Sequence, residues 1–185
     1  MKFSKTNING IFVIEPNLIK DKRGYFSETF NIMEFKKVIE NINFIQENES
    51  KSLKGVLRGL HFQKPPFTQA KLVRCIDGEV LDIALDIRKG SPTYGVCHSV
   101  KLSKENKKQV FIPRGFAHGF LVLSDSAIFS YKVDNFYSAE CDSGIRWNDK
   151  ELNIKWGIDE KDVFVSSKDS NLPFFSEFDS PFTFQ

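Results

Sequence analysis

The sequence has few cysteines, and those it has follow no recognisable spacing. Three are present in 185 residues, Cys75, Cys97 and Cys141, and no two of them form a Cys-x-x-Cys pair. An odd number at wide intervals argues against both a disulfide framework and a zinc knuckle. The pattern favours reduced thiols, which are typical of a cytoplasmic protein.

Long apolar runs and an excess of one charge are also missing. The N-terminal stretch MKFSKTNING contains no apolar signal core, and no segment approaches the ~18–20 apolar residues of a membrane span. The 26 Lys and Arg residues nearly balance the 24 Asp and Glu residues, which leaves a net charge of +2. This balance argues against a nucleic-acid or membrane-surface partner. We therefore expect a cytoplasmic protein with neither partner.

Histidine is scarce as well, which bears on metal binding. Only His61, His98 and His118 occur. The common metal site of β-barrel enzymes uses two histidines one residue apart, with a nearby carboxylate and a distant third histidine. The segment Leu60-His61-Phe62-Gln63 lacks that pair, so we expect no metal. We interpret His98 as structural, and we leave both a packing and a pocket-lining role open for His118.

Short strand-like runs recur between turn-forming residues along the whole chain. Such punctuation, together with 19 phenylalanines available for a core, predicts one antiparallel β-sandwich or barrel domain over residues 1–185. The pair Asp77-Gly78 between two apolar runs predicts a hairpin. The predicted strands are residues 11–15, 25–30, 56–61, 71–75, 80–88, 96–102, 109–112, 119–123 and 128–133.

Strict alternation is clearest over residues 81–88, LDIALDIR, where the aliphatic side chains share one face and Asp82 and Asp86 share the other. Aspartates in line on a sheet usually face water, so we expect this face to be solvent-exposed. A polar pocket inside the barrel is the alternative.

One early helix is predicted after Asn31, which can act as its N-cap with Glu34 three residues later. The residues that would form its packing face are Ile32, Phe35, Val38 and Ile39. After Ser143 the periodicity is lost, and we expect loops with a short helix or two near Lys150.

Several segments, in order along the chain, closely resemble the dTDP-4-dehydrorhamnose 3,5-epimerase family. Each alone would be weak evidence, but together they span about residues 10–170 and are specific. The segments are DKRGYF at 21–26, VLRGLHFQ at 56–63, KLVRC at 71–75, IPRGFAHGF at 112–120, WND at 147–149 and SKD at 167–169.

The resemblance implies an all-β fold, an antiparallel jelly-roll (cupin-like) β-sandwich with a few short helices. It also implies a homodimer that needs no cofactor. The substrate would be a dTDP-linked 4-keto-6-deoxyhexose, dTDP-4-dehydro-6-deoxy-D-glucose, epimerised at C3 and C5 on the way to L-rhamnose.

Residue roles also follow from the resemblance. His61 matches the general base, Tyr131 the general acid, Asp169 the carboxylate that orients the histidine, and Lys71 a cation near the C4 keto oxygen. Tyr137 matches an aromatic residue that stacks on thymine. Further matches to substrate-contacting positions are Arg23, Glu28, Gln46, Asn48, Arg58, His118, Asp142 and Lys168.

The chemistry of the reaction supports these roles independently. Protons at C3 and C5 are α to the C4 ketone, so they become acidic only if the enolate is stabilised, and Lys71 supplies positive charge for that oxyanion. A neutral imidazole is a suitable base, and a carboxylate partner fixes its tautomer. Inversion then needs a proton from the opposite face, which a tyrosine hydroxyl can donate.

Three details depart from a simple match. Glu47 and Glu49 stand where the family usually has Asp and His, and Phe136 stands where a tyrosine is common. Strict alternation also sends Arg58 and His61 to opposite faces of their strand. Both can face one pocket only if the strand bulges or bends near Gly59-Leu60.

Three alternative functions remain open. One is a monoepimerase that inverts only C3 or only C5 of a related dTDP sugar. Another is a metal-dependent isomerase or oxygenase on the same sandwich, which the missing His-x-His pair disfavours. The last is a non-catalytic sugar-binding module, which would not need Tyr131 or the His61–Asp169 pair.

Overall fold

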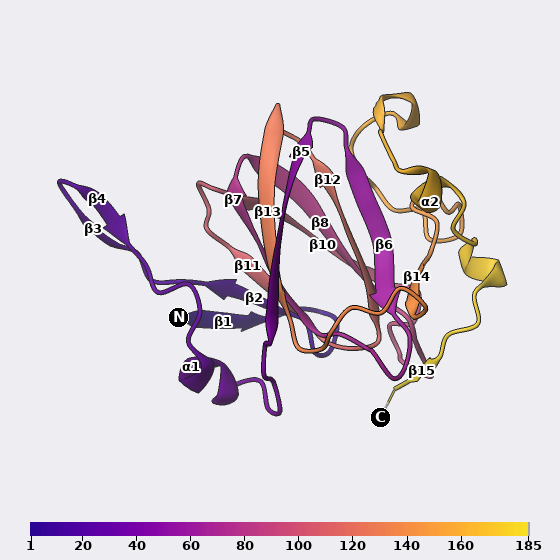
Figure 1. The fold of residues 1–185 in the computed structure, drawn as a ribbon, viewed down its shortest axis with the longest axis horizontal. Helices are drawn as coiled ribbons and strands as arrows, with labels where there is room; N and C mark the ends of the chain where they lie inside the picture. The colour runs from indigo at the N-terminus through magenta and orange to yellow at the C-terminus, as the bar shows by residue number, and fades with distance from the viewer. Residues whose placement is uncertain (185) are drawn as a thin grey trace.

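Two antiparallel sheets lie face to face in the computed structural model, which describes residues 1–184 (Figure 1). The six-stranded sheet contains, in spatial order, β1 (Lys2–Lys5), β2 (Phe12–Glu15), β11 (Gln109–Ile112), β7 (Lys71–Asp77), β13 (Ser126–Val133) and β5 (Gln46–Leu53). The five-stranded sheet contains, in spatial order, β10 (Cys97–Ser103), β8 (Glu79–Asp86), β12 (Phe116–Val122), β6 (Leu57–Gln63) and β14 (Asp142–Gly144). The predicted antiparallel sandwich is confirmed.

Smaller elements decorate the sandwich. The antiparallel pair β3 (Ile19–Asp21) and β4 (Gly24–Phe26) forms a hairpin that projects from the body (Figure 1). A parallel pair joins β9 (Arg88–Lys89) to β15 (Phe182–Thr183). The helical segments are α1 (Ile32–Lys36), α2 (Ser167–Ser170) and the 3-10 turns η1 (Glu160–Asp162) and η2 (Phe175–Glu177).

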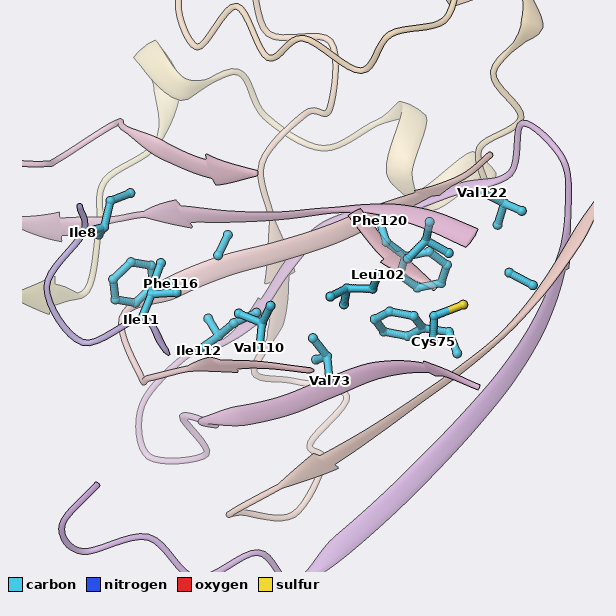
Figure 2. Packing of buried hydrophobic residues seen from close by; sticks show 14 residues of the cluster. Ile8, Ile11, Val73, Cys75, Leu102, Val110, Ile112, Phe116, Phe120 and Val122 are labelled. Carbon is cyan, nitrogen blue, oxygen red and sulfur yellow. The ribbon is translucent and has the colours of Figure 1, made fainter. Parts of the chain in front are cut away.

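The main core fills the space between the two sheets. Figure 2 shows apolar side chains from both sheets meeting there, among them Val73 and Val110 from one sheet and Leu102 and Phe120 from the other. Phe120 stacks on Phe129 with ring centroids 4.1 Å apart. Each large aromatic side chain buried in this layer removes much apolar surface from water, which is the main force that holds the sheets together.

Two further clusters cover the outer faces. The segment after β14 folds back over the five-stranded sheet, where Trp156, Phe178 and Phe182 pack in one cluster with Ile83 and Leu85. Helix α1 and its flanking loops cover part of the six-stranded sheet through a phenylalanine cluster. Its members are Phe3, Phe30, Phe35 and Phe44.

The turn at Asp77-Gly78 differs from the prediction. It joins β7 to β8, but these strands belong to different sheets and do not pair. The hairpin prediction was therefore wrong. The local signal reports the tight turn correctly, since Gly78 has φ +79°. Which strands pair depends on the fold around the turn, and here the chain crosses from one sheet to the other.

The expected solvent exposure of Asp82 and Asp86 was also wrong, because their side chains are 1% and 0% exposed. Strand β8 lies inside its sheet, with the sandwich interior on one face and the C-terminal segments on the other. Each buried carboxylate has partners. Asp82 accepts a hydrogen bond from His118, and Asp86 accepts from Arg88.

The helix predictions have a mixed outcome. Asn31 caps α1 as predicted, because its side chain accepts from the Met33 N–H at 2.9 Å. Residues near Lys150 form turns, and the short helices of the C-terminal third lie later, at 160–177. Over residues 1–184, no helix is long and apolar enough to cross a membrane.

The crossing turn gives a first test. A Cβ on Gly78 would lie 2.1 Å from the Ser126 carbonyl oxygen, whereas a Cβ on Gly90, at a similar φ of +81°, meets nothing within 4 Å. We expect Gly90→Ala to cost about 1 kcal/mol of unfolding free energy, the price of a left-handed conformation. Gly78→Ala should cost about 3 kcal/mol, because a backbone clash is added. Urea unfolding measures both, and equal losses would contradict the crossing geometry.

Candidate active site

A cavity of about 460 Å³ opens between the two sheets and is bordered by α2 and the segment that precedes it. Apolar residues such as Phe120, Phe129 and Phe164 form part of its wall. The polar residues that line it are Glu49, Ser50, Arg58, His61, Lys71, His118, Tyr131, Ser166, Lys168 and Asp169. A concave site with a few convergent titratable groups is typical of a ligand or catalytic pocket.

A bulge in β6 brings Arg58 and His61 to the same cavity. On the neighbouring strand β12, Phe120 pairs with Arg58 and His118 pairs with His61, so β6 has one more residue than β12 over this stretch. The extra residue reverses the alternation, and both side chains line the cavity. The bulge that the sequence required at Gly59-Leu60 is therefore present.

Two glycines make this arrangement possible. Gly59 has φ +141°, and a Cβ on it would lie 2.5 Å from the Cα of Gly119 on β12. A Cβ on Gly119 would in turn lie 2.7 Å from the Arg58 carbonyl oxygen. The two backbones thus approach each other more closely than any side chain allows.

His61 is held by a carboxylate that comes from the far end of the chain. Its Nε2 lies 2.6 Å from Oδ1 of Asp169 on α2, and the other carboxylate oxygen accepts the Gly59 N–H at 3.3 Å. The side chain of Asp169 is 4% exposed and that of His61 is 30% exposed. Because a carboxylate only accepts, the hydrogen of the neutral ring lies on Nε2 and Nδ1 is free to act as a base.

Local structure fixes Asp169 for this contact. Ser166 is the N-cap of α2, and its hydroxyl accepts the Asp169 N–H at 3.1 Å. Burial acts to raise the pKa of Asp169, but the hydrogen bond and charge of His61, with the Gly59 and Ser166 contacts, bring that pKa below its ordinary value. The carboxylate therefore stays ionised beside the imidazole.

Lys71 enters the cavity from β7 on the facing sheet. Its Nζ donates to the backbone carbonyl of His61 at 3.3 Å. Burial lowers the pKa of this ammonium to about 8, and Asp82 and Asp142 oppose the shift. At neutral pH Lys71 is thus mainly charged, in an environment where that charge acts strongly.

Tyr131 lines the same cavity from β13, opposite β6. Burial raises the pKa of its hydroxyl, and the polar side chain of Asn48 and the charge of Arg58 act in the other direction. Asn48 lies directly across from it on β5. The phenol therefore keeps its proton at neutral pH, as an acid must.

His118 also lines the cavity and forms a second imidazole–carboxylate pair. Its Nε2 lies 2.8 Å from Oδ2 of Asp82, and its ring stacks on Phe129. Burial lowers the pKa of His118 even though Asp82 opposes the shift. Asp82 was not among the predicted site residues. Val80 and Ala84, apolar residues on the same face of the strand as Asp82, were the available sign that this face is covered as well.

Some predicted site residues lie at the edge of the cavity. Tyr137 donates to Asp142 at 3.0 Å, and Lys168 donates to the same carboxylate oxygen. Of these, only Lys168 lines the cavity. On β5, Gln46 donates to Asn48 at 2.9 Å, and neither of them lines it.

Other predicted residues lie outside it. Arg23 is in the β3–β4 hairpin, where its side chain is 84% exposed and paired with Asp21 at 2.6 Å. Glu28 follows that hairpin and accepts from Asn31. The hairpin and the cavity wall formed by β6 and α2 lie on opposite sides of the molecule in Figure 1.

The carboxylates that replace the usual family residues on β5 have different positions. Glu47 lies outside the cavity and binds Ser130 and Lys132 at 2.9 and 2.5 Å. Glu49 lines the cavity. Over residues 1–184, no group of three or more His, Cys, Asp or Glu side chains is arranged to hold a metal ion.

The comparisons with known proteins agree with this geometry. A family model described as dTDP-4-dehydrorhamnose 3,5-epimerase matches residues 5–177. The chain belongs to this epimerase family. A Shigella flexneri protein named dTDP-4-dehydrorhamnose 3,5-epimerase is 51% identical over 172 residues, which cover 92% of this chain and 94% of that protein.

Solved structures extend the family assignment to the fold. A Legionella pneumophila epimerase, crystallised with dTDP-4-keto-L-rhamnose, is 42% identical, with a TM-score of 0.95 over 100% of this chain and 98% of its own. A 3'-monoepimerase from Streptomyces bikiniensis, in complex with dTDP-quinovose, is 31% identical, with a TM-score of 0.86 over 92% and 86% of the two chains. The jelly-roll fold expected of the family is thereby confirmed.

The contact between His61 and Asp169 should be visible as acid sensitivity. The folded-state pKa of Asp169 lies below its ordinary value of 3.8, so the contact stabilises the fold above that pH and is lost as pH falls through the lowered pKa. We expect Asp169→Asn to cost about 2 kcal/mol near pH ~5 and less than about 1 kcal/mol near pH ~3. Urea unfolding at several pH values measures this loss of unfolding free energy.

The matched control is Asp159→Asn, since Asp159 is exposed and outside the cavity. Its unfolding free energy should stay close to that of the unsubstituted protein at both pH values. If the loss of unfolding free energy in Asp169→Asn were the same at both pH values, an ionised contact between Asp169 and His61 would be contradicted.

Proposed function

We propose that the protein epimerises dTDP-4-dehydro-6-deoxy-D-glucose at C3 and C5, giving dTDP-4-dehydro-L-rhamnose, without a metal or an organic cofactor. The observation that carries the proposal is the position of two proton-transfer groups. His61 on β6 and Tyr131 on β13 line one cavity from facing sheets, so they can reach opposite faces of a sugar ring between them.

Proton abstraction is the first step. Nδ1 of His61 removes the proton from the carbon α to the C4 ketone, while Asp169 holds Nε2–H and stabilises the imidazolium that forms. Negative charge then develops on the C4 oxygen. The Lys71 ammonium stabilises this enolate, and burial makes its charge more effective than in water.

Protonation from the other face completes the inversion. Tyr131 donates its phenolic proton to the enolate carbon on the face opposite His61. A single group that removed and returned the proton would mostly restore the original configuration. His61 then releases its proton to solvent and Tyr131 takes one up, so both groups are restored. Repeating the sequence at the second α carbon gives the doubly inverted product.

The nucleotide would be held near the mouth of the cavity. Arg58, steadied by a hydrogen bond to Ser52 at 3.1 Å, and Lys168 supply positive charge for a diphosphate. Tyr137 is linked to Lys168 through Asp142 and is 57% exposed, so its ring is available to stack on thymine.

The alternative of a monoepimerase has less support. The relatives named 3,5-epimerase reach 51% identity, whereas the compared 3'-monoepimerase is 31% identical. The two activities differ in which carbons exchange protons with solvent. Deuterium incorporation into the 4-keto sugar, read by NMR at C3 and C5, distinguishes them, and exchange at one carbon only would reject the double inversion.

The acid and base can be separated with the same assay. His61→Asn should bind substrate almost normally and lose proton exchange at both carbons by about 10²–10⁴-fold, because the base is gone. Tyr131→Phe should still incorporate deuterium while forming little L-configured sugar, because the base returns the label to the face it came from.

His98→Asn is the matched control, since His98 does not line the cavity, and it should exchange at close to the unsubstituted rate. Retention of more than about a tenth of the exchange by His61→Asn would exclude His61 as the base. If Tyr131→Phe lost proton exchange and inversion to the same extent, Tyr131 could not act solely as the proton donor.

We also propose that the protein acts as a homodimer in the cytoplasm, and that the β3–β4 hairpin of one protomer reaches the cavity of its partner. Apolar side chains of this projecting hairpin, Ile19, Tyr25 and Phe26, are 67%, 54% and 68% exposed. An isologous contact would bury them. It would also bring Arg23 to a ligand, which it does not reach within its own chain.

Mixing two inactive variants tests this exchange of hairpins. If each cavity uses the partner's Arg23, a dimer of one His61→Asn chain and one Arg23→Ala chain has one complete cavity. Random reassociation should then recover about a quarter of full activity, because half of the dimers are mixed and each has one working site.

No recovery would be expected if Arg23 served its own cavity, because neither protomer of a mixed dimer would then be complete. Sedimentation of the unsubstituted protein tests the dimer independently. A monomer at assay concentration would reject the dimer and leave the acid–base chemistry of His61 and Tyr131 untouched.

A further inference from the structure

The buried carboxylate of Asp82 lies behind the cavity wall and has no part in the proton transfers described above. It is on β8, faces the sandwich interior and does not line the cavity. Within residues 1–184, its side chain has one hydrogen-bond partner, Nε2 of His118 at 2.8 Å. Burying a charge is costly unless it is paired, so this carboxylate requires an explanation.

The first consequence of Asp82 concerns the ring of His118. Stacking on Phe129 fixes the plane of the ring, with centroids 6.0 Å apart and an interplanar angle of 20°. The carboxylate accepts at Nε2, so this nitrogen carries the hydrogen. In the neutral ring, Nδ1 is then the acceptor. Any hydrogen bond between His118 and a sugar hydroxyl must use Nδ1.

The second consequence concerns Lys71. Burial lowers the pKa of its ammonium to about 8, and Asp82 is the foremost of the two carboxylates that oppose this shift. The ammonium must remain charged to stabilise an enolate. The other titratable or charged groups around this part of the cavity are Glu49 on β5, His61 and Arg58 on β6, His118 on β12, Tyr131 on β13, Asp142 on β14, and Asp169 and Lys168 on α2.

Asp86 lies on the same strand as Asp82 and shows how a purely structural carboxylate differs from it. Asp86 is 0% exposed and accepts hydrogen bonds from Arg88, Ser91 and Thr93, none of which lines the cavity. These hydrogen bonds compensate the burial of Asp86 and explain it as a group that stabilises the fold. Among the described residues 1–184, Asp82 instead has a single hydrogen-bonded partner, and that partner belongs to the site.

We propose that Asp82 is a positioning residue for the epimerisation: it fixes Nδ1 of His118 as a hydrogen-bond acceptor in the cavity and balances the charge of Lys71. The role rests on the proposed function, because it acts on the groups that bind the sugar and stabilise the enolate. Asp82 contacts no reacting atom.

The test uses Asp82→Asn in the full-length protein, with the rate of deuterium exchange measured per folded molecule across the pH range. Asparagine keeps the shape but removes the charge and can either accept from or donate to Nε2. We expect the rate to fall about 10–100-fold. Loss of the anion also lowers the pKa of Lys71, so the alkaline fall in rate should move to lower pH.

Asp86→Asn is the matched control. It makes the same change on the same strand. It should lower the stability of the fold without moving the pH at which the exchange rate falls on the alkaline side, here called the alkaline limb. The proposal is overturned if Asp82→Asn keeps the full rate and the same limb. It is equally overturned if both variants lose rate only in proportion to lost folded protein, which is the signature of a structural role.

A measurement on the unsubstituted protein keeps the test open if the variant does not fold. Nitrogen NMR of labelled histidine, with the His118 signals assigned by their loss in His118→Phe, should show hydrogen on Nε2 and a bare Nδ1 at neutral pH. Hydrogen on Nδ1 alone would overturn the proposal. This spectrum needs no substrate, so it tests the role of Asp82 independently of the proposed function. The proposed function would be rejected by a different result, namely that the unsubstituted protein exchanges no protons of the 4-keto sugar.

Discussion

The close approach of β6 and β12 at Gly59 and Gly119 is the constraint on which the site depends. It accommodates the additional residue of β6, so that Arg58 and His61 both line the cavity instead of facing opposite sides of the sheet. The same stretch directs the Gly59 N–H to Asp169. One local irregularity thereby places a cation, a base and the anchor of its carboxylate partner together.

Two imidazole–carboxylate pairs in this cavity show how environment divides similar groups into different roles. The side chain of His61 is 30% exposed, whereas that of His118 is 8% exposed and lies against Phe129. The greater exposure of His61 favours proton exchange at its ring. The burial of His118 favours a fixed hydrogen-bonding geometry, because burial lowers the pKa of this ring and keeps it neutral.

Much of the fold could be predicted because each strand of the core has its own local signal. The polar strand β5, QENESKSL, is the instructive exception. It lies at the edge of its sheet, next to β13, so its side chains carry little of the aliphatic alternation that marks a core strand. The Asp77-Gly78 turn likewise indicated a reversal of the chain without indicating that the next strand joins the other sheet.

The sequence by itself determined the family, the antiparallel sandwich and the residue types available for acid–base chemistry, because motifs and alternation are local properties. Tertiary structure alone decided that Asp82 is buried beside His118 and that Arg23 lies away from the cavity of its own chain. Burial and partnership depend on which strands become neighbours. That pairing joins residues far apart in the chain, such as His61 and Asp169, through packing that no short segment encodes.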